Sequence, residues 1–278
     1  MSNEWQVDHL DVDAYLDRIG YRAEPAATGQ TLAELHRAHV TAIPFENLDL
    51  VLGRGISVDL DAVQAKLVHR GRGGYCHEHG VLFAAALTRL GYTVDRLLAR
   101  IGADEDHPRP RTHMNLHVYA DDGQYVADVG FGAGLLEPLP WADTRPHQQG
   151  GWTYRLAPVG DSSWRLHERI GADWSALYTF TEEPQHASDV QVANHFTATH
   201  PSSPFVGQLV VMGKDAHVRR RLVGRQFTVT WPDGTTDQQQ LTDDELVTAL
   251  HDQFGLPVSE EETADVLAGV PPYEHGRE

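Results

Sequence analysis

The sequence predicts an α+β protein of several parts, in which a helical segment precedes a strand-rich segment and a mixed segment. Up to about Leu90, apolar residues recur at the spacing of one helix face. After Gly91 the spacing changes to the alternation typical of strands, and turn residues separate one strand from the next. This order predicts helices first and an antiparallel barrel or sandwich second.

Composition narrows the possible partners and the compartment. The chain has 278 residues and a net charge of −18, which argues against nucleic acid or an anionic membrane as a partner. Its single cysteine excludes an internal disulfide and is typical of a reducing environment. No signal peptide is evident, so we expect a cytoplasmic protein. The 17 histidines are scattered rather than paired at metal-ligand spacing, which predicts no metal site.

Helix signals begin near the N-terminus. Val12, Tyr15, Leu16 and Ile19 recur at helical spacing and stop before Gly20. The second and third helices are expected to begin at capping side chains, Thr31 (with Glu34 completing a capping box) and Asp59. Later helices are expected over residues 188–199, after Thr242 and after Ser259.

Strand patterns fill the middle of the chain and recur after it. The expected strands cover residues 93–100, 112–119, 125–129, 152–157, 164–169, 176–180, 208–212 and 226–231. The turn signal Asp121-Asp122-Gly123 joins the second and third of these strands, which predicts a β-hairpin.

The only cysteine, Cys76, follows Gly73-Gly74 and precedes the helix-forming run from Val81 to Leu90. It is therefore expected at or near the first turn of a helix, where free N–H groups and the helix dipole favour a thiolate. A thiolate is the reactive form of cysteine. The alternative is a buried cysteine with a structural role only.

A cysteine nucleophile requires a base and a group that orients the base. The predicted hairpin offers His113 and His117 on one face and Asp128 on the return strand. A tight turn at Asp122-Gly123 places His117 opposite Asp128, whereas His113 requires a slipped register, a bulge or a bend. Hairpin geometry alone therefore favours His117. Either histidine can also be an ordinary solvent-facing strand residue.

Three segments resemble the signature segments of the arylamine N-acetyltransferases: Arg72-Gly73-Gly74-Tyr75-Cys76, Arg111-Thr112-His113 and Ala127-Asp128-Val129-Gly130-Phe131-Gly132. Residues 43–47 and 199–205 are also similar to segments of that family. Two positions beside the cysteine depart from the usual pattern. His77 replaces an aromatic residue, and Gly80 replaces the asparagine of bacterial members. The resemblance therefore does not define the acceptor preference of this chain.

The resemblance implies a helical bundle over residues 1–91, a β-barrel over 92–200 and an α/β lid over 201–278. It implies a papain-like triad of Cys76, His113 and Asp128, and this replaces the preference for His117. The implied reaction is ping-pong transfer of an acetyl group from acetyl-CoA, through a thioester on Cys76, to an arylamine or hydrazine. The expected assembly is a monomer or a homodimer.

The resemblance also implies contacts for the two substrates. The aromatic walls of the acceptor pocket would be Phe45, Phe131 and Phe205. The CoA contacts would be Thr112, Gly130, Gly132 and Trp231, with Phe205 also lining the channel. The run Arg219-Arg220-Arg221 can attract CoA phosphates, although a solvated basic turn is the favoured interpretation. Glu46 and Arg72 lie in signature segments and are predicted to form a buried ion pair.

Three rival functions remain at this level. An amide synthase of the ansamycin type would use the same fold and triad to close a macrolactam. A Cys-His-Asp hydrolase would pass the acyl group to water. A metal-binding module could use Cys76, His77, His79 and the strand histidines, but no second ligand pair is apparent.

Overall fold

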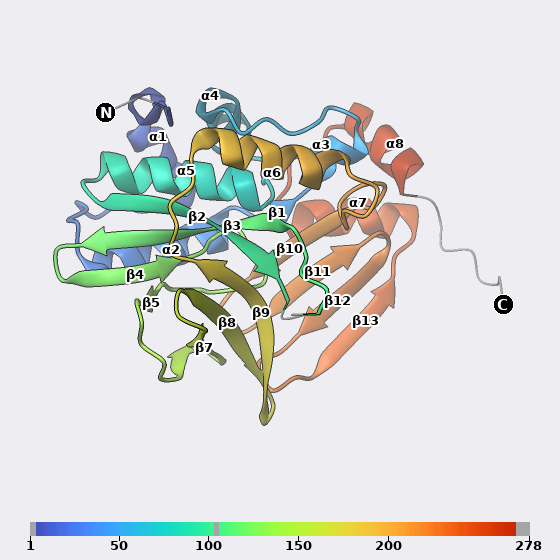
Figure 1. Cartoon of the computed structure of the whole chain (residues 1–278). Coiled ribbons are helices and arrows are strands. Elements are labelled where there is room, and N and C mark those ends of the chain that lie inside the picture. Colours follow the sequence, from blue (N-terminus) through green and yellow to red (C-terminus); the bar gives the residue numbers. More distant parts are fainter. Residues whose placement is uncertain (1–3, 103–105, 271–278) are drawn as a thin grey trace.

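The computed structural model describes residues 4–102 and 106–270, and the other residues, including the C-terminal tail from Pro271, lie outside that description. Figure 1 shows two layers on the N-terminal side, with α5 and α6 lying along strands β2 and β3. A second sheet, covered by α7 and α8, forms the C-terminal side. The predicted order of helices, strands and a mixed end is confirmed.

The helical elements are η1 (Val7–His9), α1 (Val12–Ile19), α2 (Gly29–Ala42), α3 (Leu48–Val51), α4 (Leu60–Gln64), η2 (Ala65–His69), α5 (Cys76–Arg89), α6 (Ala187–Thr199), α7 (Asp243–Asp252) and α8 (Glu260–Gly269). The strands are β1 (Phe45–Glu46), β2 (Thr93–Ile101), β3 (Arg111–Ala120), β4 (Gly123–Ala127), β5 (Leu139–Pro140), β6 (His147–Gln149), β7 (Trp152–Val159), β8 (Ser163–Ile170), β9 (Asp173–Thr181), β10 (Val210–Lys214), β11 (Arg219–Val223), β12 (Gln226–Thr230) and β13 (Thr236–Gln240).

Most helices begin and end where the sequence predicts, but the cap of α2 differs. Thr28, not Thr31, has the extended backbone of a capping residue, and its hydroxyl accepts the N–H of Thr31 at 3.3 Å. Thr31 already lies inside the helix, because α2 begins at Gly29. The prediction of Thr31 as the cap is therefore wrong, and Glu34 accepts instead from the hydroxyl of Tyr21.

Helix α5 begins at Cys76, which confirms that this residue lies in the first turn of a helix, and the chain leaves the helix at Gly91 with φ +95°. Glu78 caps this helix, because its Oε2 accepts the N–H of Tyr75 at 3.0 Å. Cys76 is the first residue of this helix, so it lies at the N-terminal end, where the backbone N–H groups have no partner within the helix.

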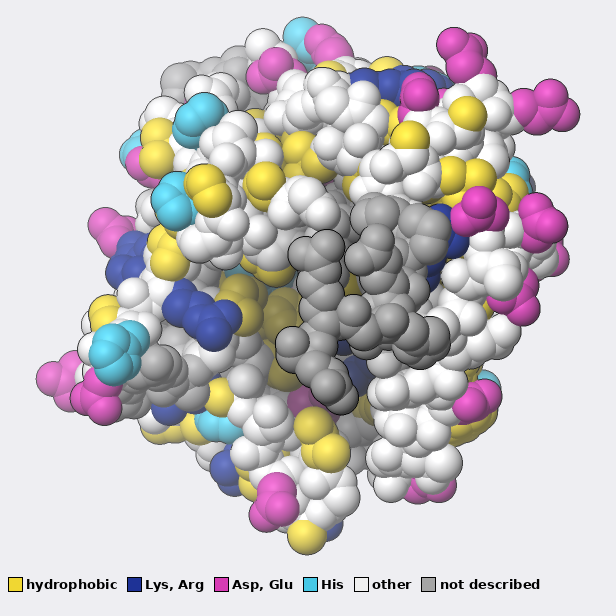
Figure 2. Space-filling view, turned by 90° about the vertical axis from the view of Figure 1, so that its right-hand side faces the viewer, with side chains coloured by type: hydrophobic (Ala, Val, Ile, Leu, Met, Phe, Trp, Pro, Cys, Tyr) yellow, Lys and Arg dark blue, Asp and Glu magenta, His cyan; other side chains and the backbone are white. Residues whose placement is uncertain are grey.

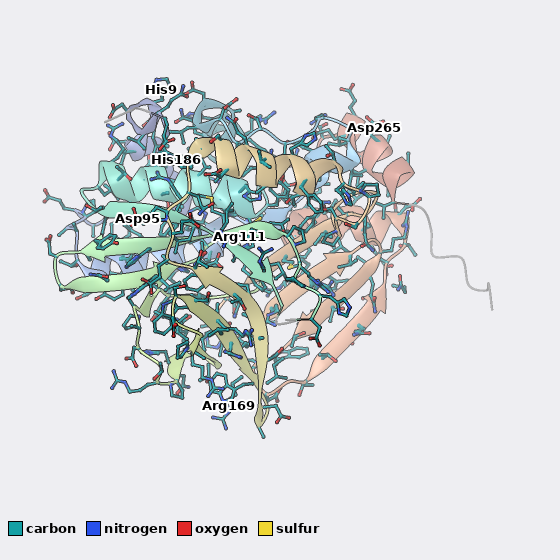
Figure 3. The ribbon with its side chains drawn as sticks, in the orientation of Figure 1. His9, Asp95, Arg111, Arg169, His186 and Asp265 are labelled. Carbon is teal, nitrogen blue, oxygen red and sulfur yellow. The ribbon has the colours of Figure 1, made fainter. Side chains whose placement is uncertain are left out.

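The central strands form a near-closed antiparallel barrel in the order β5-β4-β3-β2-β9-β8-β7-β6. The predicted hairpin is present: β3 pairs with β4 from Ala120↔Gly123 to Leu116↔Ala127. Figure 3 places Arg169 at the tip of the β8–β9 hairpin, far from Arg111 at the start of β3 near the middle of the molecule. Helices α2, α5 and α6 contact β2, β3 and β4, so they pack on the side of the barrel that these strands form.

The C-terminal sheet has the order β1-β10-β11-β12-β13, so its edge strand comes from the N-terminal part of the chain. Three of its strands, β1, β11 and β13, were not predicted. Arg219-Arg220-Arg221 belongs to β11 and is not a turn, because Arg219 to Val223 pair with β10 and β12 on both sides. Strand β13 has exposed polar residues throughout and so lacks apolar alternation. The division of the chain after residues 91 and 200 stays a prediction.

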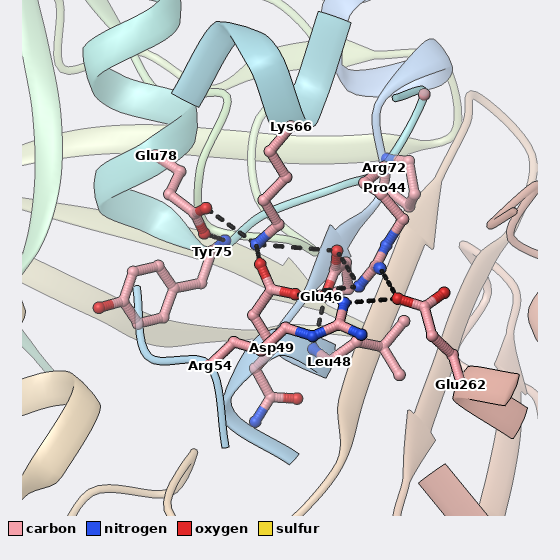
Figure 4. Close-up of polar contacts among 12 residues, drawn as sticks. Pro44, Glu46, Leu48, Asp49, Arg54, Lys66, Arg72, Tyr75, Glu78 and Glu262 are labelled. Carbon is pink, nitrogen blue, oxygen red and sulfur yellow. Dashed lines mark hydrogen bonds and ion pairs between the residues drawn. The ribbon is translucent and has the colours of Figure 1, made fainter. Parts of the chain in front are cut away.

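The predicted pair of Glu46 and Arg72 is confirmed and belongs to a larger buried cluster (Figure 4). Arg72 Nη2 lies 3.2 Å from Glu46 Oε1, and both side chains are buried. Lys66 Nζ lies 2.9 Å from Glu78 Oε1 and 3.1 Å from Asp49 Oδ2. Arg72 also reaches Glu262 of α8 at 3.5 Å. This buried ion cluster ties the Gly-Gly segment before Cys76 to α3, η2 and α8.

Replacing Arg72 by alanine should lower the free energy of unfolding by about 3–5 kcal/mol, because it removes the nearer cation from the buried Glu46 and leaves only Lys66, 3.9 Å away. Urea unfolding of the wild type and Arg72→Ala measures this loss. The matched control is Arg22→Ala, which removes an arginine whose side chain is 74% exposed beside Asp17. An equal loss in both variants would contradict the assignment of a stabilising role to the cluster.

Candidate active site

The three predicted catalytic residues meet at one point, although they come from different elements. Cys76 begins α5, His113 lies on β3, and Asp128 follows the last residue of β4. His113 Nε2 lies 2.7 Å from Asp128 Oδ2, and both residues are only 2% exposed. The thiol of Cys76 lies 3.5 Å from the carbonyl oxygen of Thr112. Cys76 also contacts the ring of His113, so the three side chains come together in the interior.

The inference from hairpin geometry, which favoured His117, is wrong. Ladder pairing stops at Leu116↔Ala127, so Asp128 has left the sheet and the register no longer decides its partner. His117 pairs with Val126, bonds to Gln124 Oε1 at 3.0 Å and stacks on Trp141 with centroids 3.5 Å apart. His117 is therefore buried against Gln124 and Trp141, and its contacts within the described residues do not include Asp128.

Asp128 is buried in a set of donors that favour its ionised form. Burial raises its pKa, but His113, Tyr178 and the N–H of Gly130 outweigh burial and hold the pKa below its usual value. The Gly130 N–H lies 3.0 Å from Asp128 Oδ1. Asp128 is therefore a carboxylate at neutral pH and can hold the proton of His113 on Nε2.

Burial and neighbouring groups also shift the pKa values of His113 and Cys76 in opposite directions. Burial lowers the pKa of His113, but the charge and hydrogen bond of Asp128 and the contact with Cys76 raise it to about 10. Burial raises the pKa of the Cys76 thiol, but His77 and His113 lower it to about 6. At neutral pH the site therefore holds a thiolate beside an imidazolium, which is the reactive pairing for a cysteine nucleophile.

The two positions that depart from the family pattern have clear surroundings. His77 is fully buried and packs edge-on against Tyr75, with centroids 5.7 Å apart. Neither of its ring nitrogens has a hydrogen-bond partner among the residues that the structure describes. At Gly80, an added Cβ would lie 2.6 Å from the sulfur of Met114, so the Met114 side chain fills the space that a larger residue would need.

A cavity of about 620 Å³ opens beside Cys76 and His113. Figure 2 looks onto a hollowed face, where hydrophobic side chains lie deep between groups of Lys and Arg. The predicted binding residues that line the cavity are Phe45, Thr112, Gly130, Phe131 and Phe205. Gly132 lies behind it, where an added Cβ would be 3.0 Å from the Phe45 ring. Trp231 is 39% exposed and is not among the described residues that line the cavity.

Several residues at this site carry no clear signal in the sequence. Arg109, Arg219 and Arg221 line the cavity, so the predicted basic turn is instead part of a cavity wall. Tyr178 contacts Asp128 from β9, and Met212 lines the cavity from β10. Only strand pairing brings them here, and the alternation within β11 could have indicated that Arg219 and Arg221 share a face.

Metal-binding clusters and membrane-spanning helices also bear on the class of protein. In residues 4–102 and 106–270, no group of three or more His, Cys, Asp or Glu side chains could hold a metal ion. No helix in this part of the chain is both long and apolar enough to span a bilayer.

A helix-borne cysteine facing a histidine and an aspartate from an adjoining barrel is the arrangement of papain-like cysteine enzymes. A family model described as N-acetyltransferase matches residues 28–263. The arylamine N-acetyltransferase of Mycolicibacterium smegmatis is 36% identical, with 94% of this chain and 97% of that protein covered. The chain therefore belongs to the arylamine N-acetyltransferase family and is an acetyltransferase.

Solved structures agree with this membership. The arylamine N-acetyltransferase of Mycobacterium abscessus superimposes with a TM-score of 0.91 at 34% identity, covering 97% of this chain and 98% of that one. The Mycobacterium marinum enzyme, solved in complex with CoA, has a TM-score of 0.87 at 35% identity and covers 94% of this chain and 98% of its own. The predicted fold of helical bundle, barrel and C-terminal α/β part is confirmed.

The rate of Cys76 alkylation by iodoacetamide should rise with pH around a midpoint of about 6, because the thiolate is the reacting form. Cys76 is the only cysteine, so mass spectrometry of the whole protein reports this rate directly. In His113→Ala the midpoint should move up toward the ordinary thiol value. A wild-type midpoint at about 8.5, the value for free cysteine, would contradict the ion pair.

Replacing His77 by phenylalanine should raise the midpoint of the same titration, because it removes an imidazole that lowers the pKa of the thiol. It should not destabilise the fold, because phenylalanine fills the same buried site and keeps the edge-on contact with the Tyr75 ring. Thermal unfolding of His77→Phe and of the wild type checks that the stability of the fold is unchanged. An unchanged alkylation midpoint would show that His77 only fills space.

Proposed function

We propose that the protein transfers an acetyl group from acetyl-CoA to the nitrogen of an arylamine or hydrazine, through a thioester on Cys76. The observation that carries the proposal is the thiol of Cys76 at the start of α5, facing a cavity together with His113 while Asp128 holds the ring. The related Mycobacterium marinum enzyme has been solved with CoA, which supports acetyl-CoA as the donor.

In the first half-reaction, the Cys76 thiolate attacks the thioester carbonyl of acetyl-CoA. The carbonyl oxygen becomes negative, and the backbone N–H of Cys76 at the free end of α5 is a suitable donor to it. The carbon–sulfur bond to CoA then breaks, and the CoA sulfur takes the proton of the His113 imidazolium. Cys76 is left acetylated and His113 neutral.

In the second half-reaction, the amine nitrogen attacks the acetyl-Cys76 thioester. His113 accepts the proton that the nitrogen loses, and the Cys76 sulfur leaves as a thiolate. Asp128 stabilises the imidazolium that forms and keeps the ring oriented. The starting ion pair is thereby restored, and the products are the N-acetylated amine and CoA.

The cavity walls have separate roles in this proposal. Phe45, Phe131 and Phe205 would stack on the aryl ring of the acceptor and keep water from the thioester. The CoA contacts would come from Thr112, Gly130, Gly132 and Trp231. Trp231 would have to act from outside the cavity, because it follows β12 with a half-exposed ring.

The proposed setting is cytoplasmic, with small-molecule partners only and a monomeric or homodimeric assembly. The net charge of −18 supports the exclusion of nucleic acid and anionic membrane surfaces. We also retain the three-part division into residues 1–91, 92–200 and 201–278 as a proposal.

Purified protein should release CoA from acetyl-CoA rapidly only when an arylamine or isoniazid is added. Cys76→Ser should abolish this release, and His113→Ala should reduce kcat by about 10³-fold or more, because the nucleophile and its base act as a unit. His117→Ala is the control and should keep most activity, since its ring bonds to Gln124 outside the triad. A thiol reagent that absorbs light on reaction with CoA follows the rate.

Other outcomes of this assay would point to the rival functions. Rapid formation of acetate without an amine would indicate a hydrolase. Acetyl-CoA that does not react with the wild type under any amine would contradict the proposed donor and leave an amide synthase of the ansamycin type. Retained activity in His113→Ala with loss in His117→Ala would overturn the assignment of the base.

A further inference from the structure

A buried histidine outside the proposed triad contacts the segment that carries Asp128. His36 lies on α2 with no exposed surface. Its Nε2 lies 3.0 Å from the backbone nitrogen of Asp128, and its Nδ1 lies 3.0 Å from the carbonyl oxygen of Leu136. One imidazole ring therefore joins the two ends of the segment 128–136.

These two bonds require one form of the ring. Nδ1 must carry the proton to donate to Leu136, and Nε2 must keep its lone pair to accept the N–H of Asp128. Burial lowers the pKa of His36 to about 4, against the opposing effect of its bonds to Leu136 and Asp128. The ring is therefore neutral at the working pH and packs edge-on against Phe83.

The segment 128–136 needs such a restraint because it is rich in glycine and has no regular structure. Gly130, Gly132 and Gly134 alternate along it, and Gly132 has φ +77°. Glycine raises the conformational entropy that must be lost to fix a chain. Yet this segment presents Asp128 to His113 and places the Phe131 ring 5.2 Å from the His113 ring.

We propose that His36 is a positioning residue that ties the ends of the segment 128–136 together, so that Asp128 stays aligned with His113. This inference rests on the proposed function only in taking His113 and Asp128 as the pair that activates Cys76. His36 touches neither the cavity nor the thiol among the contacts of the described residues, so it acts on the site through the two ends of the segment 128–136.

The test compares His36→Phe with His39→Phe. Phenylalanine keeps the aromatic volume but removes both hydrogen bonds of His36. His39 is a matched control, because it lies on the same helix with no exposed surface and bonds to Tyr15 and His79, away from the segment. Both variants lose buried hydrogen bonds, so both should unfold at lower temperature. Only His36→Phe should change the segment and the thiol.

Two readouts separate positioning from general stability. Hydrogen–deuterium exchange of peptides covering residues 128–136 should become about tenfold faster or more in His36→Phe but not in His39→Phe. The pH midpoint for alkylation of Cys76 should rise by about one pH unit in His36→Phe and stay unchanged in His39→Phe. Neither readout uses acetyl transfer, so the inference can fail or hold independently of the proposed function.

A third variant, His36→Gln, covers the case in which the phenylalanine variant does not fold. Its amide can both donate and accept, so it should restore part of the wild-type exchange protection and alkylation midpoint. The proposal is overturned if His36→Phe, or His36→Gln where the former is unfolded, shows the exchange and midpoint of the wild type. It is also overturned if His39→Phe changes both readouts as strongly.

Discussion

The site depends on a chain of buried charges in which each group is stabilised by the next. Removing water from a thiolate, an imidazolium or a carboxylate is costly, and burial alone would neutralise each of them. Asp128 holds the proton on His113, and His113 in turn lowers the pKa of Cys76. The reactive thiolate is therefore a property of the assembled cluster and not of the cysteine by itself.

A second set of buried charges fixes where that cysteine lies. Glu78 caps α5 through the N–H of Tyr75, and its other oxygen accepts from Lys66. Arg72 anchors the chain just before the Gly-Gly pair by bonding to Glu46. The helix start that carries Cys76 is thus held from both sides by ion pairs, and α8 joins the same buried cluster through Glu262.

The cavity combines features that the overall composition conceals. The chain carries a net charge of −18, yet arginines from two separate segments line the cavity beside the thiol. They stand against apolar and aromatic walls, which suits a ligand with both an anionic and an aromatic or acyl part. Strand pairing creates this contrast, because β11 presents Arg219 and Arg221 on one face between two other strands.

The sequence by itself determined the features that depend on neighbouring residues: the helix that begins at Cys76, the hairpin of β3 and β4, and most other strands. Through its resemblance to a family it also indicated His113 and the pair of Glu46 and Arg72. The tertiary structure decided what depends on distant residues. Asp128 leaves the sheet and so meets His113 rather than His117, and His36 reaches Asp128 from a different helix. Periodicity records which face a residue occupies, but it contains no information on which distant segment packs against that face.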